Sequence, residues 1–295
     1  MTQEAALARL RAVLVGVGGT ILYIFVAGAL VLLATAAIAR AWPAAGGLPG
    51  QVTLPALVLQ GVTQTIGFLG ATWLVGTKVL GLDARALRLA WPAGAGRWAA
   101  RLFVTGAALV VVAMLAATVL GGARWRHDAG GAGGYVAGVA TWTLALLLPA
   151  FSEEVAVRGV PLAALERPLG RPAAILLTSA GFALAHAANP SVTPLALVHI
   201  GLAGIFLALA CLLPGGLWTS TAAHLGWNAA LMALESPVSG MPLADLPLLG
   251  YDAGGPAWLT GGAFGVEGGV LGGAALLAGA GLTWNWLRRK DLGIT

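Results

Sequence analysis

The sequence contains very little charge. Only 9% of its 295 residues are Asp, Glu, Lys or Arg, whereas 59% are hydrophobic, and the mean hydropathy is +0.89. A soluble domain carries roughly a quarter charged residues, so this chain lacks the polar surface of a soluble globular protein. We therefore expect a polytopic integral membrane protein. Its fold class is expected to be all-α, because a spanning helix satisfies its backbone hydrogen bonds internally.

Cysteine is scarce as well, and basic clusters are absent. The single cysteine, Cys211, lies in the apolar run 202–213, so an internal disulfide is excluded and a packing role is expected. The net charge is +5, but the basic residues are scattered singly between apolar runs. A nucleic-acid-binding protein gathers them into a stripe or patch, so we expect no nucleic-acid partner.

Long apolar runs occur throughout the chain instead. About 20 apolar residues are needed to cross the hydrocarbon core of a bilayer. The sequence predicts about eight transmembrane helices, in a single integral membrane domain over residues 1–295. The candidate spans are 12–39, 52–75, 102–121, 135–165, 172–188, 194–213, 217–234 and 268–287.

The basic residues predict the orientation of these spans. Cytoplasmic loops carry an excess of Lys and Arg. With the N-terminus inside, three basic residues fall in external loops, one (Arg158) falls within a span, and the other twelve of the sixteen are cytoplasmic. We therefore expect a multi-pass protein of the inner (plasma) membrane with both termini cytoplasmic. The cytoplasmic residues would be Arg9, Arg11, Lys78, Arg85, Arg88, Arg97, Arg101, Arg167, Arg171, Arg288, Arg289 and Lys290.

The fourth span contains three ionisable residues. Such groups cost several kcal/mol at bilayer depth, so each is a candidate functional residue. Glu154 and Arg158 are four residues apart on one helix face, in the favourable acid-before-base order, and are expected to neutralise each other. Glu153 lies about 100° around the helix and has no local partner. A structural ion pair explains the first two residues but leaves the third carboxylate unexplained.

Two further polar pairs occur at helical spacing. Phe182 lies one turn before His186 in the fifth span, and His224 lies one turn before Asn228 in the seventh. Singly, an intramembrane His or Asn is often a hydrogen-bonding contact between helices. Counted along the helices at 1.5 Å per residue, however, these groups and Glu153 reach a similar depth. We expect them to converge on one site.

These residue types suit the hydrolysis of an amide by water. A carboxylate beside a neutral imidazole can take a proton from water. A histidine and a carboxamide can donate hydrogen bonds to a developing oxyanion. No serine or cysteine nucleophile is needed for this chemistry.

Taken together, the three motifs resemble those of a known family. Glu153-Glu154-x-x-x-Arg158, Phe182-x-x-x-His186 and His224-x-x-x-Asn228, in this order on separate spans, are similar to the three motifs of the CPBP family. This family comprises CAAX prenyl proteases of the Rce1 type and bacteriocin-processing enzymes, and is also called the ABI family. The likeness runs from about residue 152 to 234, within an expected catalytic core over 135–234.

The resemblance implies an intramembrane endopeptidase of the glutamic type. Glu153 would be the general base, and His186 would help to bind and activate the water. His224 and Asn228 would form the oxyanion hole, while Glu154, Arg158 and Phe182 would support the site. No cofactor is expected. His199, on the sixth span, lies outside the motifs and is expected to pack or to form a hydrogen bond.

Three alternative functions remain open. A zinc-dependent intramembrane metalloprotease would use the same two histidines and a glutamate, although the spacing is not His-Glu-x-x-His. A proton-coupled transporter would use Glu153, Glu154 and Arg158 as a relay, but no inverted repeat supports it. A non-catalytic bacteriocin-immunity or scaffold protein would keep the fold without the chemistry.

The expected partners are the lipid bilayer and a membrane-associated or lipidated protein or peptide substrate. The Ala-, Gly- and Arg-rich composition resembles that of a high-GC bacterium, which argues against a farnesylated CAAX protein as the native substrate. A leader peptide, a C-terminal sorting tail and a membrane-anchored regulator are the alternatives. The sequence does not choose among them and does not indicate an oligomeric state.

Overall fold

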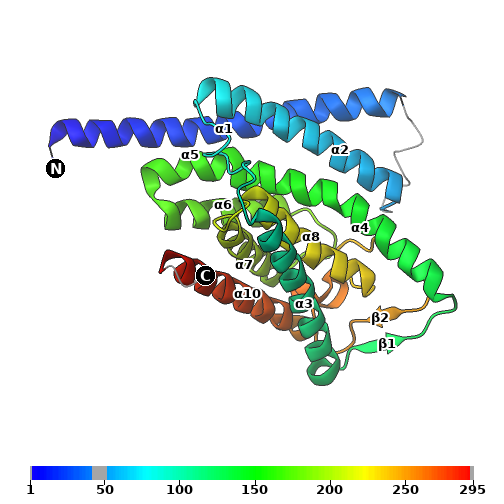
Figure 1. Ribbon diagram of the computed structural model, residues 1–295. Helices are drawn as coiled ribbons and strands as arrows, with labels where there is room; N and C mark the ends of the chain where they lie inside the picture. The colour runs from blue at the N-terminus through cyan, green and yellow to red at the C-terminus, as the bar shows by residue number, and fades with distance from the viewer. Residues whose placement is uncertain (1, 42–51, 293–295) are drawn as a thin grey trace.

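The protein is a bundle of helices with one short β-ribbon at one end (Figure 1). The computed structural model describes residues 2–41 and 52–292. In chain order the elements are α1 (Gln3–Ala41), α2 (Leu54–Ala71), the π-helical η2 (Thr72–Val79), α3 (Ala95–Gly121), β1 (Arg124–Arg126), α4 (Ala132–Glu154), the π-helical η3 (Val155–Gly159), α5 (Val160–Leu169), α6 (Arg171–Ala185), α7 (Pro194–Ala210), α8 (Leu217–Ala233), β2 (Gly250–Asp252), α9 (Ala257–Thr260), the short 3-10 turns η4 (Gly262–Phe264) and η5 (Val266–Gly268), and α10 (Val270–Asp291).

The prediction of a multi-pass, all-helical membrane protein is confirmed, but the number of spans is confirmed only in part. Within the described residues, five helical segments are long and apolar enough to cross a membrane: Gln3–Ala41, Leu54–Val79, Ala95–Gly121, Ala132–Leu169 and Val270–Lys290. The helices α6, α7 and α8 have 15, 17 and 17 residues and are shorter than a full span requires.

The fourth predicted span is one continuous helical segment whose winding changes directly after Glu153 and Glu154. The segment passes from α4 through η3 into α5, so that π-helical winding begins directly after Glu154. Pro149 lies inside α4, and Pro161 follows η3 and has no N–H to donate to the preceding turn. Short π-helical insertions of this kind occur frequently at functional sites. The segment is thus locally rewound where the polar residues lie.

The helix α8 occupies the centre of the bundle, packed against α3, α4 and α7. Its closest partner is α3. The two backbones approach so closely that a Cβ on Gly106 would lie 2.4 Å from the carbonyl oxygen of Ala223, and one on Gly226 would lie 2.1 Å from that of Phe103. Small residues allow such crossings between membrane helices. Because α8 is enclosed by other helices, it can carry many polar residues.

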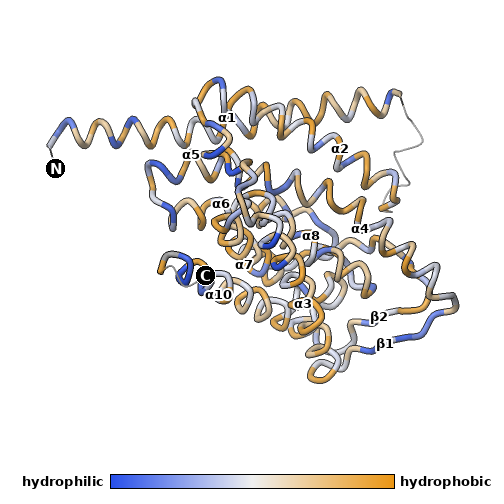
Figure 2. The backbone as a smooth tube through the Cα atoms, in the orientation of Figure 1, coloured by the Kyte–Doolittle hydropathy of each residue, from blue (hydrophilic) through white to orange (hydrophobic). Residues whose placement is uncertain are grey.

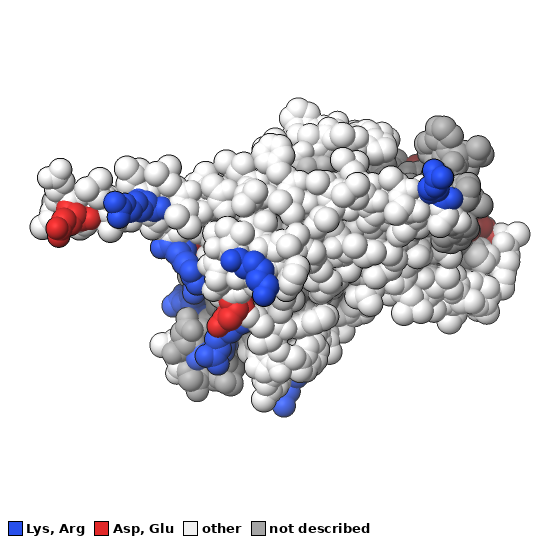
Figure 3. Space-filling view, turned by 90° about the horizontal axis from the view of Figure 1, so that it is seen from above, with Lys and Arg blue, Asp and Glu red and all other residues white. Residues whose placement is uncertain are grey.

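The outer helices consist mostly of hydrophobic residues (Figure 2). On α1, for example, Phe25 and Leu32 are exposed. The N-terminus, the turn between α5 and α6, and the C-terminal end of α10 lie at one end of the bundle, which we call the basic end (Figure 1). Most of the Lys and Arg side chains visible from above lie toward this end (Figure 3).

The opposite end is closed by the connection between α8 and α10. Its strand β2 pairs with β1 in antiparallel register, with Trp125 opposite Tyr251. The aromatic rings of these two residues pack with their centroids 5.0 Å apart. Residues of the same connection, Ser239 and Glu267, reach into the bundle beside α8. The connection between α8 and α10 is therefore folded into the protein.

Candidate functional site

The ion pair predicted within the fourth span is fully buried. The side chains of Glu154 and Arg158 are 0% and 1% exposed, and Arg158 Nη1 donates to Glu154 Oε1 at 3.0 Å. The second guanidinium nitrogen donates to the carbonyl oxygen of Gly204 on α7, also at 3.0 Å. The guanidinium carbon lies 4.6 Å from the ring centroid of Phe182. The pairing predicted from the four-residue spacing is confirmed, and the pair also connects three helices.

Glu154 accepts two further hydrogen bonds from α8. The Ser220 hydroxyl donates to Oε2, and the Nδ1–H of His224 donates to Oε1 at 3.0 Å. Ser220 was not predicted from the sequence, although it lies one helical turn before His224 and so shares a helix face with it. A buried charge must be paired and hydrogen-bonded to be tolerated. Glu154 meets both conditions, because Arg158 on η3 balances its charge, and Ser220 and His224 on α8 donate hydrogen bonds to it.

These bonds orient the His224 ring. Because Nδ1 is engaged by Glu154, the other ring nitrogen, Nε2, points away from that carboxylate. His224 Nε2 lies 3.8 Å from Glu153 Oε2. A neutral ring with its proton on Nδ1 has a bare Nε2, and a doubly protonated ring has a second donor there. The ring therefore faces Glu153 either as an acceptor or as a donor.

His186 approaches Glu153 from a different element. The predicted fifth span, 172–188, is wrong at its end, because α6 stops at Ala185 and His186 caps the helix. Its Nδ1–H donates to the carbonyl oxygen of Phe182 at 2.8 Å, one of the acceptors left free at a helix C-terminus. Its ring packs edge-on against the Phe182 ring, with the centroids 4.7 Å apart. Since a carbonyl can only accept, a neutral His186 presents the lone pair of Nε2.

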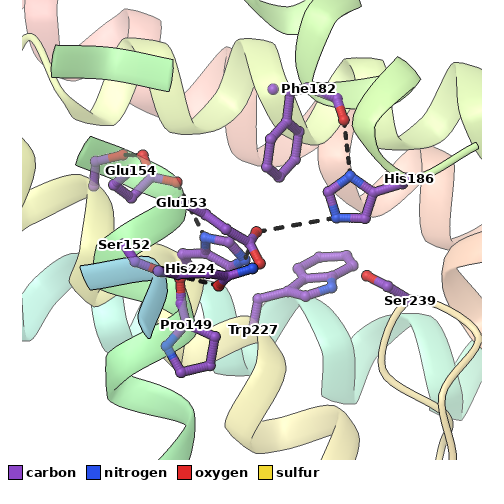
Figure 4. A network of polar contacts seen from close by, with 12 residues as sticks. Pro149, Ser152, Glu153, Glu154, Phe182, His186, His224, Trp227 and Ser239 are labelled. Atoms are coloured by element: carbon purple, nitrogen blue, oxygen red, sulfur yellow. Dashed lines mark hydrogen bonds and ion pairs between the residues drawn. The ribbon is translucent and has the colours of Figure 1, made fainter. Parts of the chain in front are cut away.

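Glu153 lies between the two histidines (Figure 4). Its Oε2 is 4.0 Å from His186 Nε2 and 3.8 Å from His224 Nε2, and its side chain is 28% exposed. These separations exceed a direct hydrogen bond and are short enough for one water molecule to bridge the groups. The predicted convergence of the fourth, fifth and seventh spans is confirmed for these three side chains.

Asn228 and both histidines line a small enclosed cavity. Its volume is about 20 Å³, and Trp227, Ser239 and Glu267 also contribute to its wall. This volume accommodates one water molecule. Asn228 is half-buried, one helical turn beyond His224. The structure thus brings all the predicted motif residues to one place.

Glu267 is a site residue that no motif in the sequence indicates. Its carboxylate is buried and accepts from Trp227 Nε1 at 2.8 Å and from the backbone N–H of Ser239 at 2.5 Å. Ser239 in turn accepts, through its carbonyl, from the side-chain amide of Asn189, three residues after His186. The hydrogen bond expected for His199 is confirmed, because its Nδ1–H donates to the Glu267 carbonyl at 3.0 Å. Glu267 therefore connects the segment between α8 and α10 to α8, through Trp227, and to the segment that follows His186, through Ser239 and Asn189.

Replacing Glu267 by alanine is expected to lower the free energy of unfolding by about 2–4 kcal/mol. The change leaves the buried Trp227 donor and the partly buried Ser239 donor without their acceptor, and each costs roughly 1–3 kcal/mol. Thermal unfolding in a mild detergent measures the effect. Glu267→Gln keeps one acceptor oxygen and is expected to lose less. An unchanged melting temperature for Glu267→Ala would contradict this role.

The same imidazoles have the arrangement of metal ligands, in that each Nδ1–H is held by an oxygen acceptor while Nε2 is free. Zinc would use Glu153, His186 and His224. Among residues 2–41 and 52–292, however, no group of three or more His, Cys, Asp or Glu side chains is arranged closely enough to hold a metal ion. Zinc would require these side chains to move together.

Comparison with known proteins confirms the resemblance found in the motifs. Residues 135–230 match the family described as type II CAAX prenyl endopeptidase Rce1-like. The matched segment spans about one third of the chain and includes Glu153, His186, His224 and Asn228. The match indicates a peptide hydrolase of the CAAX-protease type. No curated protein and no solved structure matches the chain.

Proposed function

We propose that this protein is an intramembrane endopeptidase that hydrolyses a peptide bond in a membrane-associated or lipidated protein or peptide. The observation that carries the proposal is the position of Glu153 Oε2, within 4.0 Å of His186 Nε2 and 3.8 Å of His224 Nε2. The two histidines line a water-sized cavity, and all three residues lie in the segment that matches the Rce1-like family. The function is that of a glutamic peptidase of the CPBP (ABI) type.

In the proposed first step, Glu153 and His186 activate a water molecule. A neutral His186 offers the Nε2 lone pair, because its Nδ1–H is engaged by the Phe182 carbonyl. A water between Nε2 and the Glu153 carboxylate can donate one hydrogen to each. As its oxygen bonds to the carbonyl carbon of the substrate, the water gives a proton to Glu153, which acts as general base.

The oxyanion that forms is stabilised by His224 and Asn228. The Nδ1–H of His224 stays bound to Glu154, and in the doubly protonated ring Nε2–H donates to the oxyanion. Asn228 offers its amide N–H₂ one turn further along α8. Glu153 then transfers its proton to the amide nitrogen, the C–N bond breaks, and the products are a carboxylic acid and an amine. Arg158, Ser220 and Phe182 position these groups.

The proposed mechanism needs no metal ion. We expect a preparation treated with a chelator and then dialysed to keep its full peptidase rate, because Glu153 and His186 alone activate the water. The rate and the zinc content are measured on the same sample. Loss of activity that zinc restores would instead support the metalloprotease alternative, in which zinc is held by the two histidines and Glu153.

We also propose that the basic end faces the cytoplasm of a cell whose inner membrane holds the protein, so that both termini are cytoplasmic. The positive-inside bias supports this orientation, since the N-terminus, the α5–α6 turn and the C-terminal end of α10 share one end of the bundle (Figure 1). The substrate class remains that of a membrane-associated protein or peptide.

A comparison of strains tests the function even while the substrate is unidentified. One strain expresses the parent chain and another expresses Glu153→Ala at the same level. We expect at least one membrane or secreted peptide whose cleaved form is present only with the parent chain. A third strain expressing His186→Ala should reproduce the loss. Identical peptide profiles in all three strains would overturn the proposal and favour a transporter or a non-catalytic scaffold.

A further inference from the structure

A second and much larger cavity lies at the basic end, apart from the candidate peptidase site. It has a volume of about 1080 Å³, which is at the upper end of the range of small-molecule sites. Its walls come from the connection between η2 and α3, the start of α6, the turn between α7 and α8, and the end of α10. None of the motif residues lines it. It therefore requires an explanation of its own.

The mouth of this cavity is strongly basic. Arg85, Arg88, Arg171 and Lys290 line it, and none of the described acidic side chains does. Glu166 lies just outside and accepts from both Arg88 and Arg171, so its charge is already matched. Arg85 makes no ion pair with any described residue. The mouth thus carries more positive charge than its neighbours neutralise, which favours an anionic ligand.

Arg88 is held rigidly and has one unused donor that is buried. Its side chain is only 16% exposed, and within the described part of the chain its Nη1 has no hydrogen-bond partner. The backbone around it is fixed to α8, because Leu217 N–H donates to the Arg88 carbonyl at 3.0 Å and Trp218 Nε1 donates to the Leu89 carbonyl at 3.0 Å. A buried donor without a partner is costly. Because Arg88 also lines the cavity, a small movement of its side chain would bring Nη1 to a negatively charged oxygen bound there.

Another side of the cavity is apolar. The helix α7 packs against both α6 and α10. Leu209 and Leu212 at its end line the cavity between Leu176 on α6 and Leu287 on α10. Trp284 is exposed beside them. The cavity therefore combines a cationic mouth with a hydrophobic groove that faces the lipid.

We propose that this cavity binds an anionic phospholipid from the leaflet at the basic end. The headgroup phosphate would lie against Arg85, Arg88 and Lys290, and an acyl chain would fill the groove between α6 and α10. Basic pockets between membrane helices hold anionic headgroups in this way. An anionic phospholipid accounts for both halves of the cavity, whereas a soluble phosphate accounts only for the mouth. The site does not depend on the proposed peptidase activity.

The test uses the full-length protein, purified in a mild detergent and depleted of lipid. Dioleoyl phosphatidylglycerol is expected to raise the melting temperature with concentration and to appear as one bound lipid per chain in native mass spectrometry. Arg85→Gln/Lys290→Gln, which leaves the Glu166 contacts in place, should weaken binding by about 10- to 30-fold. Leu176→Trp, which narrows the groove, should weaken it as well.

Arg9→Gln/Arg11→Gln is the matched control. It removes the same charge from exposed positions on α1, toward the same end, and should bind as the parent does. Equal stabilisation by dioleoyl phosphatidylcholine, or equal weakening by the control, would overturn the site. Equal stabilisation by inorganic phosphate would overturn the lipid assignment. Unchanged melting temperatures of both double variants without lipid would show that the lost binding is not a loss of folding.

Discussion

Replacing Glu153 by glutamine is expected to lower the peptidase kcat/KM by about 100- to 10,000-fold while leaving the melting temperature almost unchanged. The rate falls because the amide cannot take the proton of the attacking water. Stability is kept because Glu153 is partly exposed and its nearest partners, the histidine Nε2 atoms, lie 3.8 and 4.0 Å away. Cleavage of a peptide found in the strain comparison, together with thermal unfolding, measures both effects.

The adjacent Glu154→Gln is the matched control for this experiment. The chemical change is the same, but Glu154 is fully buried and accepts from Arg158, Ser220 and His224. We expect this variant to lose stability as well as activity, since Arg158 is left as a buried charge without its counter-ion. A Glu153→Gln protein that cleaves at the parent rate would contradict the proposed role of Glu153. Equal losses of stability in the two variants would contradict the division of roles.

The division between these neighbouring carboxylates could be predicted from the sequence because helix periodicity determines it. Residues four apart share a face, so Arg158 lies beside Glu154, and Glu153 is turned toward other helices. The same periodicity placed Phe182 beside His186 and His224 beside Asn228. Counting residues along each helix also predicted that these groups reach a similar depth. Local spacing was sufficient for each of these predictions.

Contacts between distant segments could not be predicted in this way. Glu267 reaches the site only because the connection between α8 and α10 folds inward, and it is 40 residues from Trp227. Tyr23 lies on α1, which the motifs do not include, yet its hydroxyl donates to the carbonyl of Val155 in the π-helical turn at 3.4 Å. The spacing of residues within one helix does not indicate such a partner from another segment. The rewinding of the fourth span at η3 is likewise a property of the packed bundle.

The count of eight spans is not confirmed, for a related reason. The predicted spans 172–188 and 194–213 extend three residues beyond the ends of α6 and α7, whereas the predicted span 217–234 matches α8 to within one residue. At 1.5 Å per residue, a helix of 15 to 17 residues is about 22–26 Å long. The helix α8 is enclosed by other helices, so it needs neither the length nor the hydropathy of a helix that faces lipid. The helix α6 is short although Leu177 and Leu184 are exposed on it. Hydropathy alone therefore overestimates the reach of α6 and α7.

Replacing Arg158 by methionine is expected to lower the free energy of unfolding by about 3–5 kcal/mol. The guanidinium is 1% exposed and is the cation that balances Glu154, so its removal leaves a buried carboxylate held only by Ser220 and His224. Arg126→Met is the control, because this arginine is 61% exposed and lies 3.5 Å from Asp128. Such surface pairs contribute about 0–1 kcal/mol. Melting temperatures in the same detergent compare the two variants.

The double variant Glu154→Gln/Arg158→Met separates the loss of charge balance from the loss of packing. Glutamine keeps an acceptor oxygen for Ser220 and His224 but carries no charge, so no unbalanced ion remains in the interior. We therefore expect the double variant to be more stable than Arg158→Met alone, with a favourable coupling between the two sites. Simple additivity of the two single changes would mean that Arg158 stabilises the bundle through its contacts with Phe182 and Gly204 instead of through Glu154.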